Sequence, residues 1–370
     1  MERNLQDVIR QLPGAVVTGN GADRTVSDLT IDSRTAGPGS LFICIKGVNT
    51  DGHKYVAKAA AQGAVAALTE QETEVPEGLT VIRVPSTQEA VKTLAPWFYD
   101  WPARKMRMIG VTGTNGKTTT TNILRTLLTR TGHKVGLIGT INVMIGDEVR
   151  PSHNTTPDVV DLQKMLYEMV ENHCDTCVME VSSHALALDR VAGIEYDTAG
   201  VNKNTPDPPE FYKTMGKNPG GKGLLFTPLH ERIKPNKMTE FSRDEPSMAL
   251  IMPRVKTKIM TYGKGKDNDV YPLTFHVAAS HMELNLQTPV GEMDLKLHIT
   301  GEFNVYNVMG SICAAIAEGL TREDIIRGLD DFAGVPGRFQ LIHAGQPFTV
   351  VVDYRSEEHT SELQSLTNIV

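Results

Sequence analysis

The sequence predicts an α/β protein with at least two domains. Short apolar segments alternate with helix-like segments along the first hundred residues, and a strand, a glycine-rich turn and a helix follow one another over residues 108–131. Strands that alternate with helices favour a parallel sheet covered on both faces. The chain has 370 residues, and a prior of about 150 residues per domain gives two or three domains.

Composition restricts the class of protein. Hydrophobic residues make up 40% and charged residues 22%, as in globular proteins. A net charge of -7 argues against broad binding of nucleic acid or of an anionic membrane. No apolar run reaches the roughly 18 residues of a membrane span, and the N-terminus lacks the apolar segment of a signal peptide. With only 4 Cys, we expect no disulfide framework and a reducing, cytoplasmic location.

The predicted elements divide at residues 100–104, where we place a domain boundary. The first domain, residues 1–100, has strands at 41–45 and 64–68 and a helix at 53–62. The second domain, residues 101–340, has predicted strands at 108–111, 134–139 and 176–181 and a helix at 118–131. An antiparallel strand pair follows at 281–300, with its turn at 289–292. The last predicted elements are a helix at 304–320 and another helix that starts with the capping pattern of 321–324. Residues 202–246 are rich in Pro, Gly and Lys and are predicted to be irregular.

The glycine-rich loop IGVTGTNGKTTT, residues 109–120, carries the strongest signal for function. A strand, a glycine turn and a helix in this order direct backbone N–H groups at a phosphate chain. Lys117 would add charge for the β- and γ-phosphates, and the Thr118 hydroxyl would bind Mg²⁺. Val111 replaces the first Gly of the G-x-x-x-x-G-K-[ST] pattern, so an ordinary glycine turn is the alternative.

The loop alone leaves kinase, ATPase, GTPase and ligase open. A GTPase would need an Asn-Lys-x-Asp motif, and the Asn-Lys pairs at 202–203 and 236–237 lack the Asp. A small-molecule kinase or a switch ATPase is therefore the main alternative.

Together with this loop, four motifs resemble the Mur ligases of peptidoglycan synthesis. They are NTTP at 154–157, MEVSSHAL at 179–186, GEFNVYN at 301–307 and GVPGRF at 334–339. Residues 32–34, Asp-Ser-Arg, are similar to the uridine-nucleotide site of the members that add the third residue of the stem peptide. The resemblance spans residues 20–354 and implies an N-terminal UDP-sugar-binding domain followed by a central ATP-binding domain with a parallel sheet.

The resemblance implies an ATP-dependent amide ligase. In such an enzyme ATP phosphorylates the terminal carboxylate of UDP-N-acetylmuramoyl-L-alanyl-D-glutamate, and the amine of meso-diaminopimelate or L-lysine attacks the acyl phosphate. Two anions must approach each other, so positive charge is the main requirement. No nucleic-acid or membrane partner is implied, and we expect a monomer.

Site residues carry over from the family motifs by position. The catalytic group would be Lys117, Glu180 and Lys222. Lys222, as a carbamate, would join Thr118 and Glu180 as a ligand of Mg²⁺. The ATP site would comprise Gly113, Thr114, Asn115, Gly116, Lys117, Thr118, Thr119, Asn304 and Arg338. The substrate site would comprise Ser33, Asn154, Thr155, Thr156, Ser182 and Arg190.

Several of these residues have a structural alternative. Ser182 would cap the end of a strand, Glu180 would pair with a surface Lys, and residues 32–34 would be a plain turn. Lys222 would be a solvated side chain, as most Lys residues are.

Cys174 and Cys177 form one C-x-x-C pair, a spacing typical of redox and zinc sites. A zinc site needs two further ligands at finger-like spacing, and Cys44 and Cys313 are isolated. A redox pair opens a helix, whereas this pair leads into a predicted strand. Cysteines that only pack in a core are the favoured interpretation.

The chain departs from the family in three places. Pro208 stands where the family has a metal-binding His, and SRDE at 242–245 lacks the amide of the family's adenine-side motif. Residues 341–354 are interpreted as the start of a third, Rossmann-like domain that is otherwise missing, and residues 355–370 as a foreign-looking tail. These departures predict a chain that binds ATP without ligating, and the alternative function is a non-catalytic ATP-binding protein.

Overall fold

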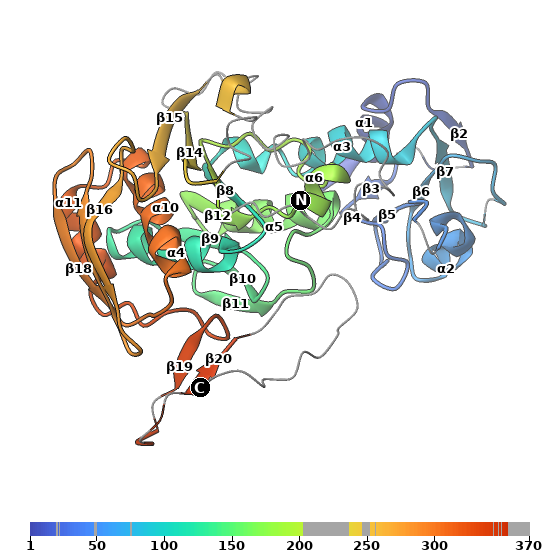
Figure 1. Ribbon diagram of the computed structural model, residues 1–370. Helices are drawn as coiled ribbons and strands as arrows, with labels where there is room; N and C mark the ends of the chain where they lie inside the picture. The colour runs from blue at the N-terminus through green and yellow to red at the C-terminus, as the bar shows by residue number, and fades with distance from the viewer. Residues whose placement is uncertain are drawn as a thin grey trace.

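A five-stranded sheet forms the N-terminal part of the molecule, coloured blue in Figure 1. The computed structural model describes residues 1–202, 237–245 and 252–353, apart from residues 20, 22, 48, 49, 75, 256, 343, 347 and 349. The sheet has the order β2-β7-β6-β5-β4, and only β2 is antiparallel to its neighbour. Its strands are β2 (Val16–Thr18), β4 (Asp28–Thr30), β5 (Ser40–Ile43), β6 (Ala66–Thr69) and β7 (Thr80–Arg83).

The remaining N-terminal elements flank this sheet. They are the short pair β1 (Arg3–Asn4) and β3 (Thr25–Val26), the helices α1 (Leu5–Arg10), α2 (Val56–Ala61) and α3 (Thr87–Phe98), and the 3₁₀ turn η1 (Gly52–Tyr55). The strands predicted at 41–45 and 64–68 are β5 and β6. The helix predicted at 53–62 is confirmed, although its first turn is the 3₁₀ turn η1.

An eight-stranded sheet forms the second part, with the order β11-β10-β9-β12-β8-β13-β14-β15. The six strands from β9 to β15 are parallel, and β10 and β11 are antiparallel at one edge. Its strands are β8 (Arg107–Thr112), β9 (Val135–Ile138), β10 (Asn142–Ile145), β11 (Glu148–Pro151), β12 (Thr176–Glu180), β13 (Thr198–Val201), β14 (Met238–Ser242) and β15 (Lys258–Tyr262). From β8 the chain first adds β9 and β12 on one side of the sheet and later β13, β14 and β15 on the other side. In such sheets ligands bind beyond the carboxyl ends of the strands, at the point where the strand order reverses.

Helices cover both faces of the large sheet, as the sequence predicts. Side chains alternate along β8, so Ile109 and Val111 join one core with α4 and α10, while Met108 joins a second core with α5. The helices are α4 (Lys117–Arg130), α5 (Val159–Glu171), α6 (Ser183–Ala187), α10 (Phe303–Ala317) and α11 (Arg322–Leu329), with 3₁₀ turns η2 (Pro102–Arg104) and η4 (Met252–Arg254). The predicted capping pattern is a complete capping box at Thr321.

Two smaller sheets complete the described chain. The predicted strand pair at 281–300 is β17 (Met282–Gln287) and β18 (Met293–Leu297), and a third strand, β16 (Tyr271–Val277), pairs with β17. The last described strands are the hairpin β19 (Gln340–Ile342) and β20 (Val350–Val352).

The prediction that residues 202–246 are irregular is wrong at its C-terminal end. Residues 238–242 form β14, which pairs in parallel with β13 and β15. The segment has only five residues and carries a charged side chain at its centre, so its apolar pattern was too weak to indicate a strand. Residues 203–236 lie outside the described part of the chain.

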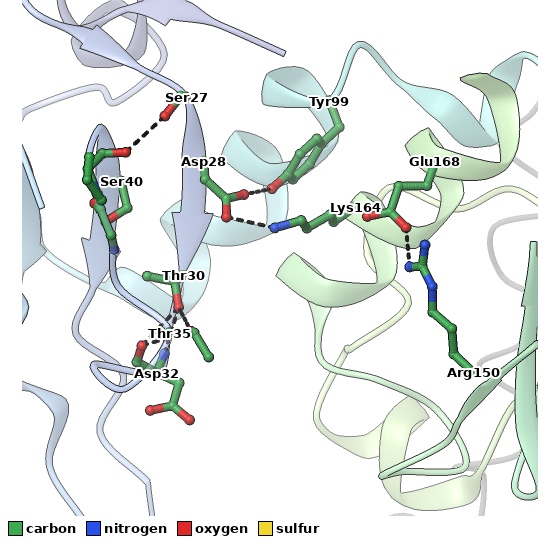
Figure 2. Close-up of polar contacts among 12 residues, drawn as sticks. Ser27, Asp28, Thr30, Asp32, Thr35, Ser40, Tyr99, Arg150, Lys164 and Glu168 are labelled. Carbon is green, nitrogen blue, oxygen red and sulfur yellow. Dashed lines mark hydrogen bonds and ion pairs between the residues drawn. The ribbon is translucent and has the colours of Figure 1, made fainter. Parts of the chain in front are cut away.

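Asp28 on β4 joins the two parts of the molecule. Its carboxylate accepts hydrogen bonds from the Tyr99 hydroxyl at 2.8 Å and from Lys164 Nζ at 2.7 Å, and Lys164 lies on α5 (Figure 2). Val159 and Val160, at the start of α5, pack in the core of the N-terminal part. The helix therefore connects the two sheets.

Glu240, at the centre of β14, is a buried carboxyl group with 1% exposure. Neither oxygen has a hydrogen-bond partner of normal geometry among the described residues, although the Ala314 N–H of α10 faces the group. Gly200 on β13 leaves space for it, because a Cβ there would collide with Oε1. Burial raises the pKa of Glu240 well above its ordinary value; the Ala314 N–H opposes this shift and Glu318 adds to it.

We expect Glu240 to make the folded state less stable as the pH rises. Above the pKa of an unfolded Glu, about 4.3, the unfolded chain releases the proton that the folded chain retains, so the free energy of unfolding falls by about 1.4 kcal/mol per pH unit. Glu240→Gln removes this titration, so the variant should exceed wild type in stability near neutral pH and approach it at about pH 5. Denaturant unfolding across this range measures the difference. The exposed Glu77→Gln is the control, and a pH-independent difference for Glu240→Gln would contradict the assignment.

Candidate functional site

The loop between β8 and α4 depends on two glycines with positive φ angles. Gly113 has φ 140° and Gly116 has φ 88°, a region that other residues rarely adopt. A Cβ on Gly116 would collide with the Asn307 side chain and lie 2.9 Å from Asn202 Nδ2. The loop is therefore packed closely between the end of β13 and α10, with the N–H groups of α4 at its open side.

Val111 explains the departure from the usual loop pattern. It is a fully buried residue of β8 that pairs with Glu180 on one side and with Gly200 on the other. The missing glycine thus lies within the strand and not in the turn, so the turn itself is complete.

Lys117 and Thr118 begin α4 at the end of this loop. Lys117 Nζ donates to the Gly113 carbonyl at 2.9 Å, which holds the ammonium group over the loop. The Thr118 hydroxyl donates to Glu180 Oε2 at 3.1 Å. Because a hydroxyl has one proton, this donation leaves its lone pairs for a cation.

Thr118 and Glu180 fit a Mg²⁺ site. Mg²⁺ prefers oxygen ligands and is usually held by one or two side chains together with phosphate oxygens and water. Among the described residues no group of three or more His, Cys, Asp or Glu side chains is placed to hold a metal by itself. The donor set therefore suits a metal that arrives with a phosphate chain.

Glu180 has a second set of partners that the sequence did not reveal. Thr140 donates its backbone N–H to Oε1 at 2.8 Å and its hydroxyl to Oε2 at 3.0 Å. The same hydroxyl lies 3.1 Å from Thr155 Oγ1. The available signal was position, because Thr140 directly follows the strand predicted at 134–139 and so reaches the carboxyl edge of the sheet.

Several predicted substrate residues converge on the other side of Glu180. The Thr156 hydroxyl donates to the Glu180 carbonyl at 3.0 Å and accepts from the Ser182 N–H at 3.0 Å. Arg190 donates to the Thr156 carbonyl at 3.0 Å. Ser182 also caps α6 by accepting from the Ala185 N–H, so the structure shows a capping role for it. Asn154 is exposed on the same loop, at 152–158.

On the nucleotide side, Asn304 is brought close to the glycine loop through Asn307. Asn304 is 2% exposed, donates to the Thr300 carbonyl and accepts from Asn307 Nδ2 at 2.8 Å. Arg338 lies in a tight turn. The next residue, Phe339, packs edge-to-face on Phe303 at the start of α10. The sequence predicts Asn304 and Arg338 for the ATP site, which stays a prediction, and it gave no indication of Asn202 and Asn307, whose side chains lie against Gly116.

Ser33 lies apart from these residues, in the turn after β4. Thr30 closes the turn through its hydroxyl, which accepts from the Asp32 N–H at 3.1 Å and lies 2.7 Å from Thr35 Oγ1 (Figure 2). The Arg34 side chain holds the pKa of Asp32 below its usual value. Residues 32–34 thus lie in a turn at the carboxyl edge of a parallel sheet, where ligands commonly bind, and the uridine site at Ser33 stays a prediction.

The four cysteines are all free and buried, which agrees with the packing interpretation. Burial raises the pKa of Cys44 to about 12. Lys222, Pro208 and the tail from residue 354 onward lie outside the described residues, so the carbamate and the lost metal ligand stay predictions.

A glycine loop between a central parallel strand and a helix, with a Thr and a buried Glu beside it, defines a P-loop nucleotide-binding protein. Family comparisons go further: residues 25–103 match the Mur ligase family catalytic domain, and residues 111–315 match the Mur ligase middle domain. The chain belongs to the Mur ligase family.

Individual relatives agree with this membership. The UDP-N-acetylmuramoyl-L-alanyl-D-glutamate--2,6-diaminopimelate ligase of Bacillus velezensis is 39% identical over 99% of this chain and 74% of its own length. A solved structure of a ligase with the same name has a TM-score of 0.76 at 23% identity and covers 96% of this chain and 71% of its own. The MurF ligase of Thermotoga maritima, solved with ADP, has a TM-score of 0.65 at 21% identity and covers 86% of this chain and 69% of its own. At these identities the two structures show the shared fold.

Within the described part of the chain, no helix is both long and apolar enough to cross a membrane.

Lys117→Ala is expected to remove most ATP binding. A charge-assisted contact to phosphate contributes about 1.5–3 kcal/mol, roughly a 10- to 150-fold loss of affinity. Isothermal titration with ATP and Mg²⁺ measures this loss. Lys258→Ala is the matched control, because Lys258 is exposed at the amino end of β15, the opposite edge of the same sheet. Equal affinity of Lys117→Ala and wild type would contradict the loop assignment.

Proposed function

We propose that the sites of this chain are those of an ATP-dependent amide ligase that joins meso-diaminopimelate to UDP-N-acetylmuramoyl-L-alanyl-D-glutamate. That the family departures, Pro208 among them, leave ATP binding without ligation stays a prediction, which the amine step below tests. The observation that carries the proposal is the position of Glu180, which contacts Thr118 of the phosphate loop and, through Thr140, Thr155 of the predicted acceptor loop. A nucleotide site and an acceptor site that share one carboxylate suit the transfer of a phosphoryl group to a bound acid. The name and 39% identity of the Bacillus velezensis relative support the choice of substrates.

Each group has a defined task in this reaction. Lys117 and the N–H groups of the loop bind the β- and γ-phosphates, which places the γ-phosphate beside the acceptor carboxylate. Mg²⁺, held by Thr118 and Glu180 and in this proposal by a carbamate on Lys222, would neutralise charge as the two anions meet. Thr155, Thr156 and Arg190 orient the acceptor, because positioning alone contributes several kcal/mol to such reactions.

In this proposal the two sheets bind different substrates. Residues 1–100 would bind the UDP-sugar through Ser33, residues 101–340 would bind ATP, and residues 341–354 would begin a further domain. The Asp28–Lys164 pair supports this arrangement because it fixes the turn after β4 relative to the central part. The unpaired, buried cysteines support a cytoplasmic location.

Ser33→Ala is expected to weaken binding of the UDP-sugar by about 5- to 10-fold, since one hydrogen bond contributes about 1 kcal/mol. ATP affinity should not change, because Ser33 lies in the other sheet. Titration of UDP-N-acetylmuramoyl-L-alanyl-D-glutamate, followed by NMR or calorimetry, tests this. Ser27→Ala, a half-buried position before β4 whose hydroxyl bonds the Pro38 carbonyl, is the control. An unchanged affinity for the sugar nucleotide in Ser33→Ala would contradict the uridine assignment.

Hydroxylamine should reveal the acyl phosphate directly. It converts an acyl phosphate to a hydroxamate and releases phosphate, but does not react with the phosphate ester that a small-molecule kinase forms. With ATP, Mg²⁺ and the UDP-muramoyl dipeptide, we expect a hydroxamate that is detectable by mass spectrometry and absent in Lys117→Ala. A phosphate ester would favour the kinase alternative, and ATP binding without any product would favour the non-catalytic one. Replacement of hydroxylamine by diaminopimelate or lysine then identifies the amine.

A further inference from the structure

Thr140 supplies two of the three hydrogen bonds that the described residues make to the Glu180 side chain. Glu180 is 1% exposed, and a carboxylate buried to this extent is stable only when donors surround it. The N–H and hydroxyl of Thr140 reach different oxygens of the carboxylate, so together they fix both its position and its rotation. Thr118 alone, with one bond to Oε2, would leave the group free to turn.

The local chain is shaped to bring Thr140 this close. β9 and β12 are parallel neighbours with Ile138 opposite Met179, so the next residues of the two strands meet at the carboxyl edge. Gly139 makes the close approach possible, because a Cβ there would lie 2.6 Å from Glu180 Oε1. The Gly139 N–H bonds the Asn142 carbonyl and closes the turn into β10.

The hydroxyl of Thr140 also determines which residue is the donor in its hydrogen bond with Thr155. It has one proton, which goes to Glu180 Oε2 because a carboxylate oxygen can only accept. In the 3.1 Å contact with Thr155, the donor is therefore the Thr155 hydroxyl. Three groups are thus ordered, with Thr155 donating to Thr140 and Thr140 donating to Glu180.

We propose that Thr140 is a positioning residue of this site, which fixes Glu180 for a Mg²⁺-nucleotide and links it to Thr155 on the acceptor loop. The proposal rests on the proposed function, since it assigns Glu180 to the metal. It adds a residue that neither the motifs nor the family resemblance identified. Partners that orient a metal ligand commonly change metal affinity about 10- to 100-fold when they are removed.

The test measures ADP binding by isothermal titration calorimetry, once with Mg²⁺ and once with EDTA. Thr140→Val retains the backbone bond and the side-chain shape but removes the hydroxyl. We expect the gain in affinity due to Mg²⁺ to fall about tenfold, while binding in EDTA is unchanged and reports an intact fold. Thr140→Ser restores the hydroxyl and should restore the gain, which a purely packing role would not predict.

Three comparisons complete the design. Thr126→Val is the control, because the half-buried Thr126 hydroxyl bonds, among the described residues, only the Asn122 carbonyl within α4. Gly139→Ala should displace Glu180 and reduce the same gain. If Thr140→Val does not fold, Thr140→Ala, which also removes the hydroxyl and retains the backbone bond, decides the role of Thr140. In a double-mutant cycle, Thr155→Val should have little further effect once Thr140 is Val.

The outcomes separate this proposal from the proposed function. A wild-type chain that binds ADP equally with Mg²⁺ and EDTA would contradict the metal assignment of Glu180 and with it the proposed function. A wild-type chain with a clear Mg²⁺ gain that Thr140→Val retains in full would overturn only the role of Thr140. Additive effects of Thr140→Val and Thr155→Val would overturn the link between the two loops.

Discussion

The pairing of β12 with β8 is the constraint on which the site depends. Parallel pairing places Glu180, the last residue of β12, opposite Val111, one residue before the end of β8. Beyond Val111 the chain enters the glycine loop and returns at Thr118, whose hydroxyl meets the Glu180 carboxylate. A shift of one residue in this register would turn Glu180 to the other face of the sheet and break the contact. The candidate metal site is thus a consequence of strand register.

The same edge also explains why small residues gather there. Gly113, Gly116 and Gly139 lie where a Cβ would approach Asn202, Asn307 or Glu180 to 3.0 Å or less. Each glycine lets a backbone segment approach a buried polar side chain. The amides of Asn202 and Asn307 bond in turn to Thr120 and Asn304, so the loop is held by a connected set of buried polar groups. Such a set is rigid only when its members are satisfied.

The sequence predicts β8, β9, β12, the β17–β18 pair and the helices α4, α10 and α11, because these segments have clear periods. It did not indicate the other five strands of the large sheet, nor β16, α5 or α6. The loop could be predicted because it follows the strongly apolar β8, and Glu180 and the acceptor motif could be predicted from the family motifs that contain them. Thr140, Asn202 and Asn307 could not, because their importance arises from contacts between strand ends that are distant in sequence. β14 was missed for a related reason: Glu240 breaks its apolar pattern, and only the space left by Gly200 on the neighbouring strand makes the segment a buried strand.

The two sheets are connected through α5, and this connection relates the two predicted substrate regions. The helix begins directly after the acceptor loop that contains Thr155 and Thr156. Its first residues pack in the N-terminal core, while Leu162 and Leu166 pack in the central core. Lys164 then reaches Asp28 on β4, five residues before Ser33. The turn at Ser33, through β4, and the acceptor loop at Thr155 are therefore both connected to α5, a helix that itself belongs to both cores.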